Sequence, residues 1–296
     1  MERRRLGKSE LDVTVLGYGA IPIGDLNVIG EKEAESVLGL VLDSGVTFVD
    51  TAPDYHSSEE RIGKYISHRR SEYFLASKCG CNITEAGKTL EPNHLWTKER
   101  LISNIEMSLR RLRTEYLDIW QIHNASVEDV HSGDLVAVME EVKQSGKVRY
   151  ISISSTLPHI TTFIERGDFV TYQIPYSALE RKHEDVISDV AAAGCGVIVR
   201  GGVAQGTNET RKSEKNNELW DKAKLDELVD EGENKTQFLL RYTISHPGMT
   251  TIIVGTNKRD HMAENLVAAE SGPLADDVYA TAKARLDEAG ESPEKA

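Results

Sequence analysis

Four residues that can transfer a proton or hold a charge follow short apolar runs in the first half of the chain. Asp50 ends "VTFVD", Tyr55 lies in the turn after it, Lys78 ends "YFLASK" and His123 ends "YLDIWQIH". A lysine ammonium beside a phenol lowers the pKa of the phenol, and a carboxylate beside the lysine keeps the lysine charged. A histidine can donate a hydrogen bond to a carbonyl oxygen that gains negative charge. The set predicts a general acid, Tyr55, next to a carbonyl group that is being reduced.

Each of these residues also has an ordinary structural interpretation. Asp50 can cap a loop, Tyr55 can pack on the surface, Lys78 can end a strand in solvent, and His123 can be a hydrogen-bonded packing residue. The functional hypothesis therefore depends on all of them meeting at one place. The set contains no electron source, so a hydride has to come from a cofactor.

The elements that must position these residues follow a repeating pattern. Eight β-branched runs alternate with longer amphipathic segments in a chain of 296 residues. This pattern predicts an α/β fold, a single-domain (β/α)8 TIM barrel, in which side chains at the carboxyl ends of the strands converge on one face. The alternative is an open doubly wound sheet, but "GYGAIPIG" lacks the G-x-G-x-x-G spacing of that fold. We expect strands at 14–19, 46–50, 73–78, 116–123, 148–154, 169–174, 196–200 and 250–255. We expect helices at 31–43, 58–68, 98–112, 132–144, 157–166, 183–193, 217–243 and 259–269, with a candidate break in 217–243 near Gly232.

Several segments fall outside the repeat. Residues 1–13 form a lead-in that is consistent with a short hairpin over the bottom of the barrel, and we expect 290–296 to be a frayed tail. Residues 79–97 are interpreted as a long irregular connection, and the polar segment 204–216 as a mobile loop. Both follow strands, so we expect them on the active face, where Trp96 and Trp220 are candidates for lining a substrate pocket.

The composition narrows the range of partners. There are 35 Lys and Arg residues against 48 Asp and Glu residues, a net charge of −13, which argues against nucleic acid or an anionic membrane as a partner. Three cysteines are too few for a disulfide framework, and the N-terminus has no apolar signal segment, so we expect a cytoplasmic protein. Cys79 and Cys81 form a C-x-C, but no second Cys/His cluster follows at zinc-finger spacing. We therefore expect no metal site.

Longer collinear motifs carry a family resemblance over nearly the whole chain. The sequence resembles the aldo-keto reductases, whose members are TIM barrels that transfer a hydride from NADPH to the carbonyl of a small aldehyde or ketone. The resemblance implies that Asp50, Tyr55, Lys78 and His123 are the catalytic tetrad, and that the protein is a monomer or a weak homo-oligomer. The motifs that carry it are "GVTFVDTAPDYHSSEERIG" (45–63), "LASKCG" (75–80), "SLRRLRTEYLDIWQIHN" (108–124), "GKVRYISISS" (146–155), "YQIPYSALER" (172–181) and "TTIIVGTNKRDHMAEN" (250–265).

The same resemblance implies a cofactor site across the barrel mouth. Ser155 replaces the usual asparagine, Arg200 stands where a tyrosine commonly stacks on the nicotinamide, and Lys258 or Arg259 is expected to replace the family's 2′-phosphate contacts. We expect NADP(H), with NAD(H) as the alternative coenzyme. Besides Asp50, the implied cofactor-binding residues are Gly19, Ala20, Ser154, Ser155, Gln173, Arg200, Gly201, Gly202, Val203, Gly206, Gly255, Thr256, Asn257, Lys258, His261, Glu264 and Asn265.

Two other functions remain open at this point. One is a barrel lyase or aldolase in which Lys78 forms a Schiff base, which requires a neutral amine. The other is a cofactor-sensing regulatory subunit similar to the potassium-channel β subunits, which resemble this family. Those subunits often lack the histidine, and His123 is present here, so the sequence favours catalysis.

Overall fold

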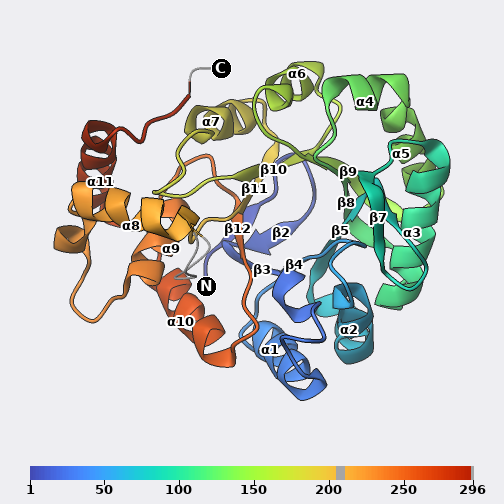
Figure 1. Cartoon of the computed structure of the whole chain (residues 1–296), viewed down its shortest axis with the longest axis horizontal. Helices are drawn as coiled ribbons and strands as arrows, with labels where there is room; N and C mark the ends of the chain where they lie inside the picture. Colours follow the sequence, from blue (N-terminus) through green and yellow to red (C-terminus); the bar gives the residue numbers. More distant parts are fainter. Residues whose placement is uncertain (205–210, 295–296) are drawn as a thin grey trace.

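Eight parallel strands close into a barrel at the centre of the molecule, as Figure 1 shows. The computed structural model describes residues 1–204 and 211–294. The predicted single-domain TIM barrel is confirmed, and each strand begins and ends within two residues of its predicted range. In the order in which they pair around the barrel, the strands are β10 (Thr171–Pro175), β11 (Gly196–Arg200), β12 (Thr251–Val254), β3 (Leu16–Gly19), β4 (Phe48–Asp50), β5 (Phe74–Cys79), β8 (Leu117–His123) and β9 (Val148–Ser154).

Helices surround the barrel because each has one apolar face to bury. In α3 (Lys98–Leu112), for example, Leu101, Ile105 and Leu112 are fully buried. None of the helices in the described ranges is long and apolar enough to cross a bilayer. The other helices that follow barrel strands are α1 (Glu31–Asp43), α2 (Ser58–Tyr65), α5 (Leu135–Gln144), α6 (His159–Arg166), α7 (Glu184–Ala192), α9 (Lys235–Ile244) and α10 (Arg259–Ser271), with the short η1 (Ile21–Ile23), η2 (Ser67–Glu72) and α4 (Val127–Ser132) between them.

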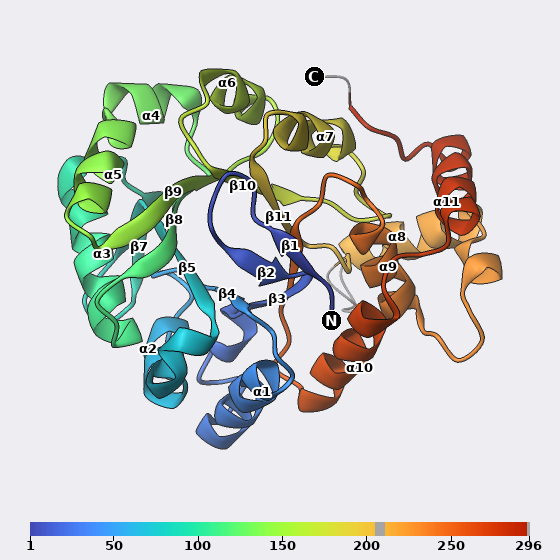
Figure 2. The same cartoon turned by 180° about the vertical axis from the view of Figure 1, so that it is seen from behind.

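The N-terminal lead-in closes the bottom of the barrel, as predicted. Strands β1 (Arg3–Arg5) and β2 (Asp12–Thr14) pair antiparallel, and Figure 2 shows this hairpin lying across the barrel. Its side chains Leu6 and Val13 are fully buried in one cluster with Phe48 and Ile198. The hairpin therefore covers the end of the barrel opposite the carboxyl ends of the strands.

The segment 79–97 contradicts the prediction of an irregular connection. Strands β6 (Cys81–Ile83) and β7 (Thr89–His94) form an antiparallel hairpin in which Cys81 lies opposite His94. Gly87, with φ of 79°, makes the turn, where the left-handed region favours glycine. The residues of β7 are mostly exposed, so the sequence carries no apolar alternation that would have revealed the strand.

The C-terminal part also differs from its predicted outline. The predicted helix 217–243 is divided into α8 (Arg211–Lys222), η3 (Leu225–Leu228) and α9, with the expected break near Gly232 between η3 and α9. Helix α11 (Asp276–Ala289) was not predicted. The break follows from a new helix start at Asn234, which forms a capping box with Gln237. Of the segment 204–216, expected to be a mobile loop, residues 205–210 lie outside the described part, and residues 211–216 contradict the prediction because they form the start of α8. The tail that was expected to be frayed is bonded to the loop before α7 at two points. The Arg181 backbone N–H donates to Glu291 Oε1, and the Glu294 backbone N–H donates to the Lys182 carbonyl oxygen.

Candidate active site

A buried ion pair joins the ends of β4 and β5. Lys78 Nζ lies 2.6 Å from Asp50 Oδ2 and donates a second hydrogen bond to the Thr51 carbonyl oxygen at 2.8 Å. Both charged side chains are at most 1 % exposed. The pair forms because β4 and β5 are parallel neighbours in the barrel and both residues stand near the carboxyl ends of their strands. The predicted meeting of Asp50 and Lys78 is confirmed.

The Asp50 carboxylate keeps Lys78 charged. Burial alone would lower the pKa of Lys78, but Asp50 and Tyr55 raise it by more, so the pKa lies above its ordinary value. A Schiff base would require Lys78 to lose this proton and leave Asp50 buried without its partner, which is costly. The arrangement therefore disfavours the lyase alternative.

Tyr55 lies between Lys78 and His123. Lys78 Nζ is 4.7 Å from the centre of the Tyr55 ring, and the rings of Tyr55 and His123 lie 6.0 Å apart at 77°. Burial raises the pKa of Tyr55 by more than Lys78 lowers it. The expected lowering of this pKa is therefore wrong for the protein without a bound cofactor, because the loss of hydration outweighs one nearby ammonium.

Asp50 Oδ1 binds two side chains that the tetrad does not include. Gln121 Nε2 donates to it at 2.8 Å and Gln173 Nε2 at 2.9 Å. These bonds hold the carboxylate so that its other oxygen faces Lys78. Gln121 was not predicted, although it lies two residues before His123 on β8 and so points to the same side of that strand. Gln173, expected to bind the cofactor, donates its amide hydrogen bond to Asp50 here.

His123 is a neutral hydrogen-bonding group at this site. Its pKa lies well below the ordinary value because of burial and of the positive charge of Lys78 and the nearby His94 and Arg200. Its Nδ1 lies 3.5 Å from both Asp54 Oδ2 and Cys81 Sγ. The other ring nitrogen, Nε2, therefore points away from these groups.

The candidate cofactor residues gather at the same end of the barrel as the tetrad. They lie at or after the carboxyl ends of their strands: Gly19 and Ala20 at β3, Ser154 and Ser155 at β9, Gln173 near the end of β10, Arg200 to Val203 at β11, and Gly255 to Asn265 after β12. Gly206 lies outside the described residues. This placement agrees with a ligand that crosses the barrel mouth.

Two observations fit an anionic cofactor at this end. Arg200 Nε is buried and has no hydrogen-bond partner within the described part of the chain. Helix α10 begins at Lys258 with no side-chain cap, so its first backbone N–H groups are suited to an anion. Lys258 is exposed there, whereas Arg259 Nη1 donates to the Ser36 carbonyl oxygen at 2.8 Å. Lys258 is thus the better candidate for binding a phosphate.

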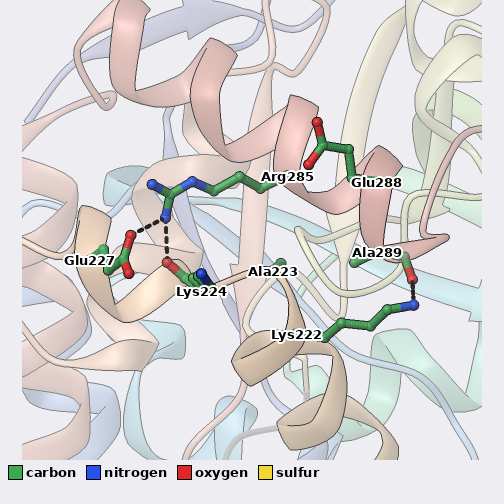
Figure 3. A pocket seen from close by; sticks show the side chains of 7 residues that line it. All are labelled: Lys222, Ala223, Lys224, Glu227, Arg285, Glu288 and Ala289. Carbon is green, nitrogen blue, oxygen red and sulfur yellow. Dashed lines mark hydrogen bonds and ion pairs between the residues drawn. The ribbon is translucent and has the colours of Figure 1, made fainter.

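A pocket of about 360 Å³ lies elsewhere, on the outside of the barrel (Figure 3). Its walls come from α8, η3 and α11, and their charged groups bind one another. Arg285 pairs with Glu227 at 3.0 Å, and Lys222 Nζ donates to the Ala289 carbonyl oxygen at 2.7 Å. None of the predicted site residues in the described ranges lines this pocket, so the barrel mouth remains the candidate active site. Of the two candidate pocket residues, Trp220 is buried against Phe238, which contradicts its predicted place in a substrate pocket. Trp96 is half-buried and stacks on His94, and its place in a substrate pocket stays a prediction.

Comparison with known proteins agrees with this geometry. The chain is 29% identical over 296 residues to the uncharacterized oxidoreductase YqkF of Bacillus subtilis, with 94% of each chain covered. It is 26% identical to the L-galactose dehydrogenase of Arabidopsis thaliana, over 90% of this chain and 88% of that one. The aldo-keto reductase AKR11C1 of Bacillus halodurans, in its holo form, superposes with a TM-score of 0.82 at 28% identity over 96% of both chains. The model of the aldo/keto reductase family matches residues 15–287, and the chain belongs to this family of oxidoreductases.

Proposed function

We propose that the protein reduces the carbonyl group of a small aldehyde or ketone with NADPH, and that Tyr55 is the general acid. The observation that carries the proposal is the buried Lys78–Asp50 pair beside Tyr55, with the neutral His123 on the other side of the phenol. A nicotinamide cofactor supplies the hydride when it is bound. The name of the L-galactose dehydrogenase relative supports testing the oxidation of alcohols as well.

Each side chain of the candidate tetrad has its own role in proton transfer or charge stabilisation. Tyr55 donates its proton to the substrate oxygen, and Lys78 stabilises the phenolate that this leaves. Asp50 keeps Lys78 charged. His123 Nε2 donates a hydrogen bond to the same substrate oxygen and stabilises its developing charge. Because His123 stays neutral, it orients the substrate and leaves proton transfer to Tyr55.

The cofactor would be held by residues from several strand ends. Ser154 and Ser155 are suited to bind the carboxamide, the backbone after β11 the pyrophosphate, and the start of α10 the adenosine phosphate. Gln173 would have to share its amide between Asp50 and the cofactor. Arg200 is suited to stack on the nicotinamide or to bind the pyrophosphate through its unpartnered Nε.

Binding and turnover test the proposal together. We expect NADPH to bind with a dissociation constant of about 10 µM or below and more tightly than NADH, and a panel of aldehydes and ketones to include substrates. Fluorescence titration and the absorbance of the reduced nicotinamide measure these two quantities. Binding of NADPH without turnover of any carbonyl or alcohol in the panel would favour the cofactor-sensing alternative.

The pH dependence of reduction follows from the raised pKa of Tyr55. A general acid works in its protonated form, so activity is lost as the pH rises through its pKa. We expect kcat/KM for reduction to stay level up to about pH 10, because burial places the pKa of Tyr55 above its ordinary value of about 10. Rates with an uncharged ketone at saturating NADPH measure this. A decline of kcat/KM centred at about pH 8 would show that Lys78 lowers the pKa of Tyr55 by more than burial raises it.

Replacement of Lys258 by Ala should weaken NADPH binding about 5- to 10-fold and leave NADH binding unchanged, because one charge-assisted hydrogen bond to the 2′-phosphate is lost. Titration of both coenzymes against the variant measures the difference. Lys32→Ala on α1, also exposed, is the matched control. An equal loss for the two coenzymes would place Lys258 away from the 2′-phosphate.

A further inference from the structure

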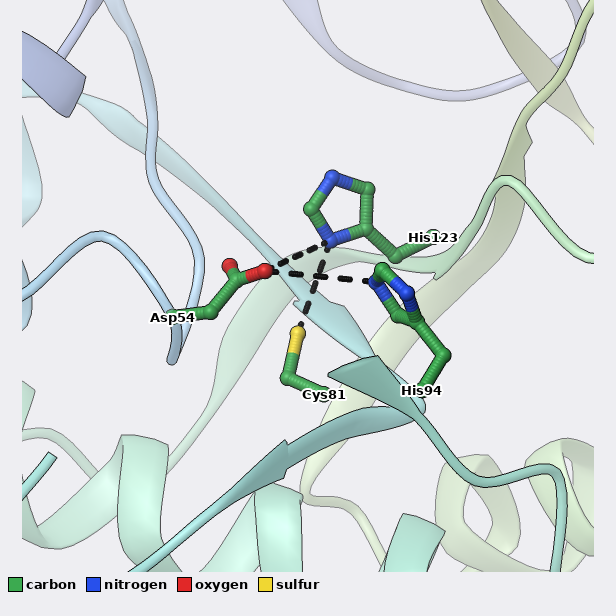
Figure 4. A group of neighbouring side chains, drawn as sticks. All are labelled: Asp54, Cys81, His94 and His123. Carbon is green, nitrogen blue, oxygen red and sulfur yellow. Dashed lines mark hydrogen bonds and ion pairs between the residues drawn. The ribbon is translucent and has the colours of Figure 1, made fainter. Parts of the chain in front are cut away.

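Four potential metal ligands converge beside the candidate catalytic histidine. Asp54 comes from the loop after β4, Cys81 from β6, His94 from β7 and His123 from the end of β8. Their ligand atoms all lie within 4.8 Å of one another. Figure 4 shows Asp54, Cys81 and His94 pointing toward Nδ1 of His123. The expectation of no metal site considered only spacing along the chain, whereas this group is assembled by the fold.

Three of the six separations between the ligand atoms are close to the edges of a metal coordination sphere. Nδ1 of His123 lies 3.5 Å from Asp54 Oδ2 and 3.5 Å from Cys81 Sγ, and His94 Nε2 lies 3.9 Å from Asp54 Oδ2. In a tetrahedral zinc site with bonds of about 2.0–2.3 Å, neighbouring ligand atoms stand about 3.3–3.6 Å apart. Two of these three separations fall in this range, the third exceeds it by a few tenths of an ångström, and the other three of the six lie within 4.8 Å.

Direct hydrogen bonding accounts for only part of the arrangement, because Cys81 Sγ and His123 Nδ1 lie within hydrogen-bonding distance at 3.5 Å whereas His94 has no such partner among the described residues. The distance of 3.9 Å between His94 and Asp54 is too long for a hydrogen bond. His94 Nε2 and Asp54 Oδ1 are buried and have no hydrogen-bond partner among the described residues. Leaving buried polar atoms unpaired costs free energy, and a cation between the four side chains would remove that cost for His94.

The chemistry of the four ligands selects the metal. One thiolate, two imidazoles and one carboxylate are a ligand set that suits Zn²⁺, and the soft sulfur disfavours Mg²⁺ or Ca²⁺. Binding requires the Cys81 thiol to release its proton to solvent. The charges of the thiolate and of Asp54 then balance those of Zn²⁺. The buried centre is therefore neutral as a whole.

The surrounding residues hold these ligands in place. Cys81 and His94 face each other across the hairpin, and Asn104 Nδ2 donates to the Cys81 carbonyl oxygen at 3.0 Å. The ring of His94 stacks on Trp96 at 5.4 Å with an angle of 6° between the planes. A Cβ on Gly80 would come within 1.9 Å of that indole, so the glycine allows the stacked arrangement. Such outer contacts orient metal ligands.

We propose that Asp54, Cys81, His94 and His123 bind one Zn²⁺ ion that ties the β6–β7 hairpin to the candidate catalytic histidine. The ion takes Nδ1 of His123, so the ring proton is on Nε2, the nitrogen that faces the substrate in the proposed reaction. Zn²⁺ at this position thus orients His123. The metal site does not depend on the proposed reductase activity.

Metal binding by the full chain tests the proposal. We expect one Zn²⁺ per chain with a dissociation constant below about 1 µM, and Co²⁺ in its place to give the intense thiolate charge-transfer and tetrahedral absorption bands. Zn²⁺ at a hundredfold excess over its dissociation constant should raise the midpoint of thermal unfolding by roughly 5 °C. Equilibrium dialysis, absorbance and thermal unfolding measure these quantities.

Variants separate this site from adventitious binding. Cys81→Ser and His94→Gln should each weaken Zn²⁺ binding at least about 100-fold, and Cys81→Ser should abolish the thiolate band of Co²⁺. Cys79→Ser, a buried thiol two residues away, and His68→Gln, an exposed histidine, are matched controls that should bind as the wild type does. Tyr55→Phe should keep full metal binding, so failure of the reductase proposal can be distinguished from failure of the zinc proposal.

Two results would overturn the proposal. One is the absence of stoichiometric Zn²⁺ binding by the wild-type chain. The other is binding that persists unchanged in both Cys81→Ser and His94→Gln. If one of these variants fails to fold, the other and Asp54→Asn decide the question, because each removes a different ligand from a different element.

Discussion

Tyr55→Phe should lower kcat for carbonyl reduction by roughly 10²- to 10⁴-fold while the dissociation constant for NADPH changes by less than about twofold. The substitution removes only the hydroxyl group, so the ring can keep its place beside Lys78 and His123. The substrate oxygen then has no acid in position to protonate it. Steady-state kinetics with a substrate from the carbonyl panel and a fluorescence titration with NADPH measure the two effects.

A second phenol controls for loss of a tyrosine hydroxyl as such. The Tyr150 hydroxyl accepts a hydrogen bond from the Glu10 backbone at 3.1 Å, at the bottom of the barrel and away from the tetrad. Tyr150→Phe should therefore retain wild-type kcat. If Tyr55→Phe reduced carbonyls at the wild-type rate, another group would be the acid and the proposed mechanism would be wrong.

Lys78→Met should abolish turnover and also lower the free energy of unfolding by about 3–5 kcal/mol, because it leaves the buried Asp50 carboxylate without its charged partner. The ion pair at 2.6 Å is at most 1 % exposed, so solvent cannot replace Lys78. Urea unfolding at neutral pH measures the loss of stability. Steady-state kinetics with the same carbonyl substrate as for Tyr55→Phe measure turnover.

The double variant Asp50→Asn/Lys78→Met separates the electrostatic cost from the catalytic role. An amide at position 50 can still accept the hydrogen bonds of Gln121 and Gln173 and carries no charge to compensate. We expect it to recover part of the lost stability and none of the turnover. Wild-type stability of Lys78→Met alone would show that the pair does not behave as a buried ion pair.

Much of the fold was predictable because its signals are local. Apolar β-branched runs marked all eight barrel strands, and three- and four-residue apolar spacing marked helices such as α3. The hairpin β6–β7 escaped because its second strand is mostly exposed and therefore lacks the alternation that reveals a half-buried strand. The break expected near Gly232 lies just before α9, where the capping box at Asn234 starts a new helix.

The candidate site was predictable in part for a similar reason. Asp50, Lys78 and His123 end or nearly end successive barrel strands, and barrel topology brings such positions together. Gln121 was missed because a glutamine within a strand has no chemical signature until its partner, Asp50, is known. The direction of the Tyr55 pKa was missed because burial, which dominates it, depends on side chains from distant segments.

The sequence by itself determined the repeating strand–helix pattern and the candidate residues of the tetrad with their order along the chain, because periodicity and residue type are local properties. Only the tertiary structure decided that the loss of hydration outweighs Lys78 at Tyr55, and that Asp50 is held by two glutamines. It alone also placed Asp54, Cys81 and His94 around one nitrogen of His123. These properties depend on distances between segments far apart in the chain. Such distances are set only once the barrel has closed and the β6–β7 hairpin has folded beside His123.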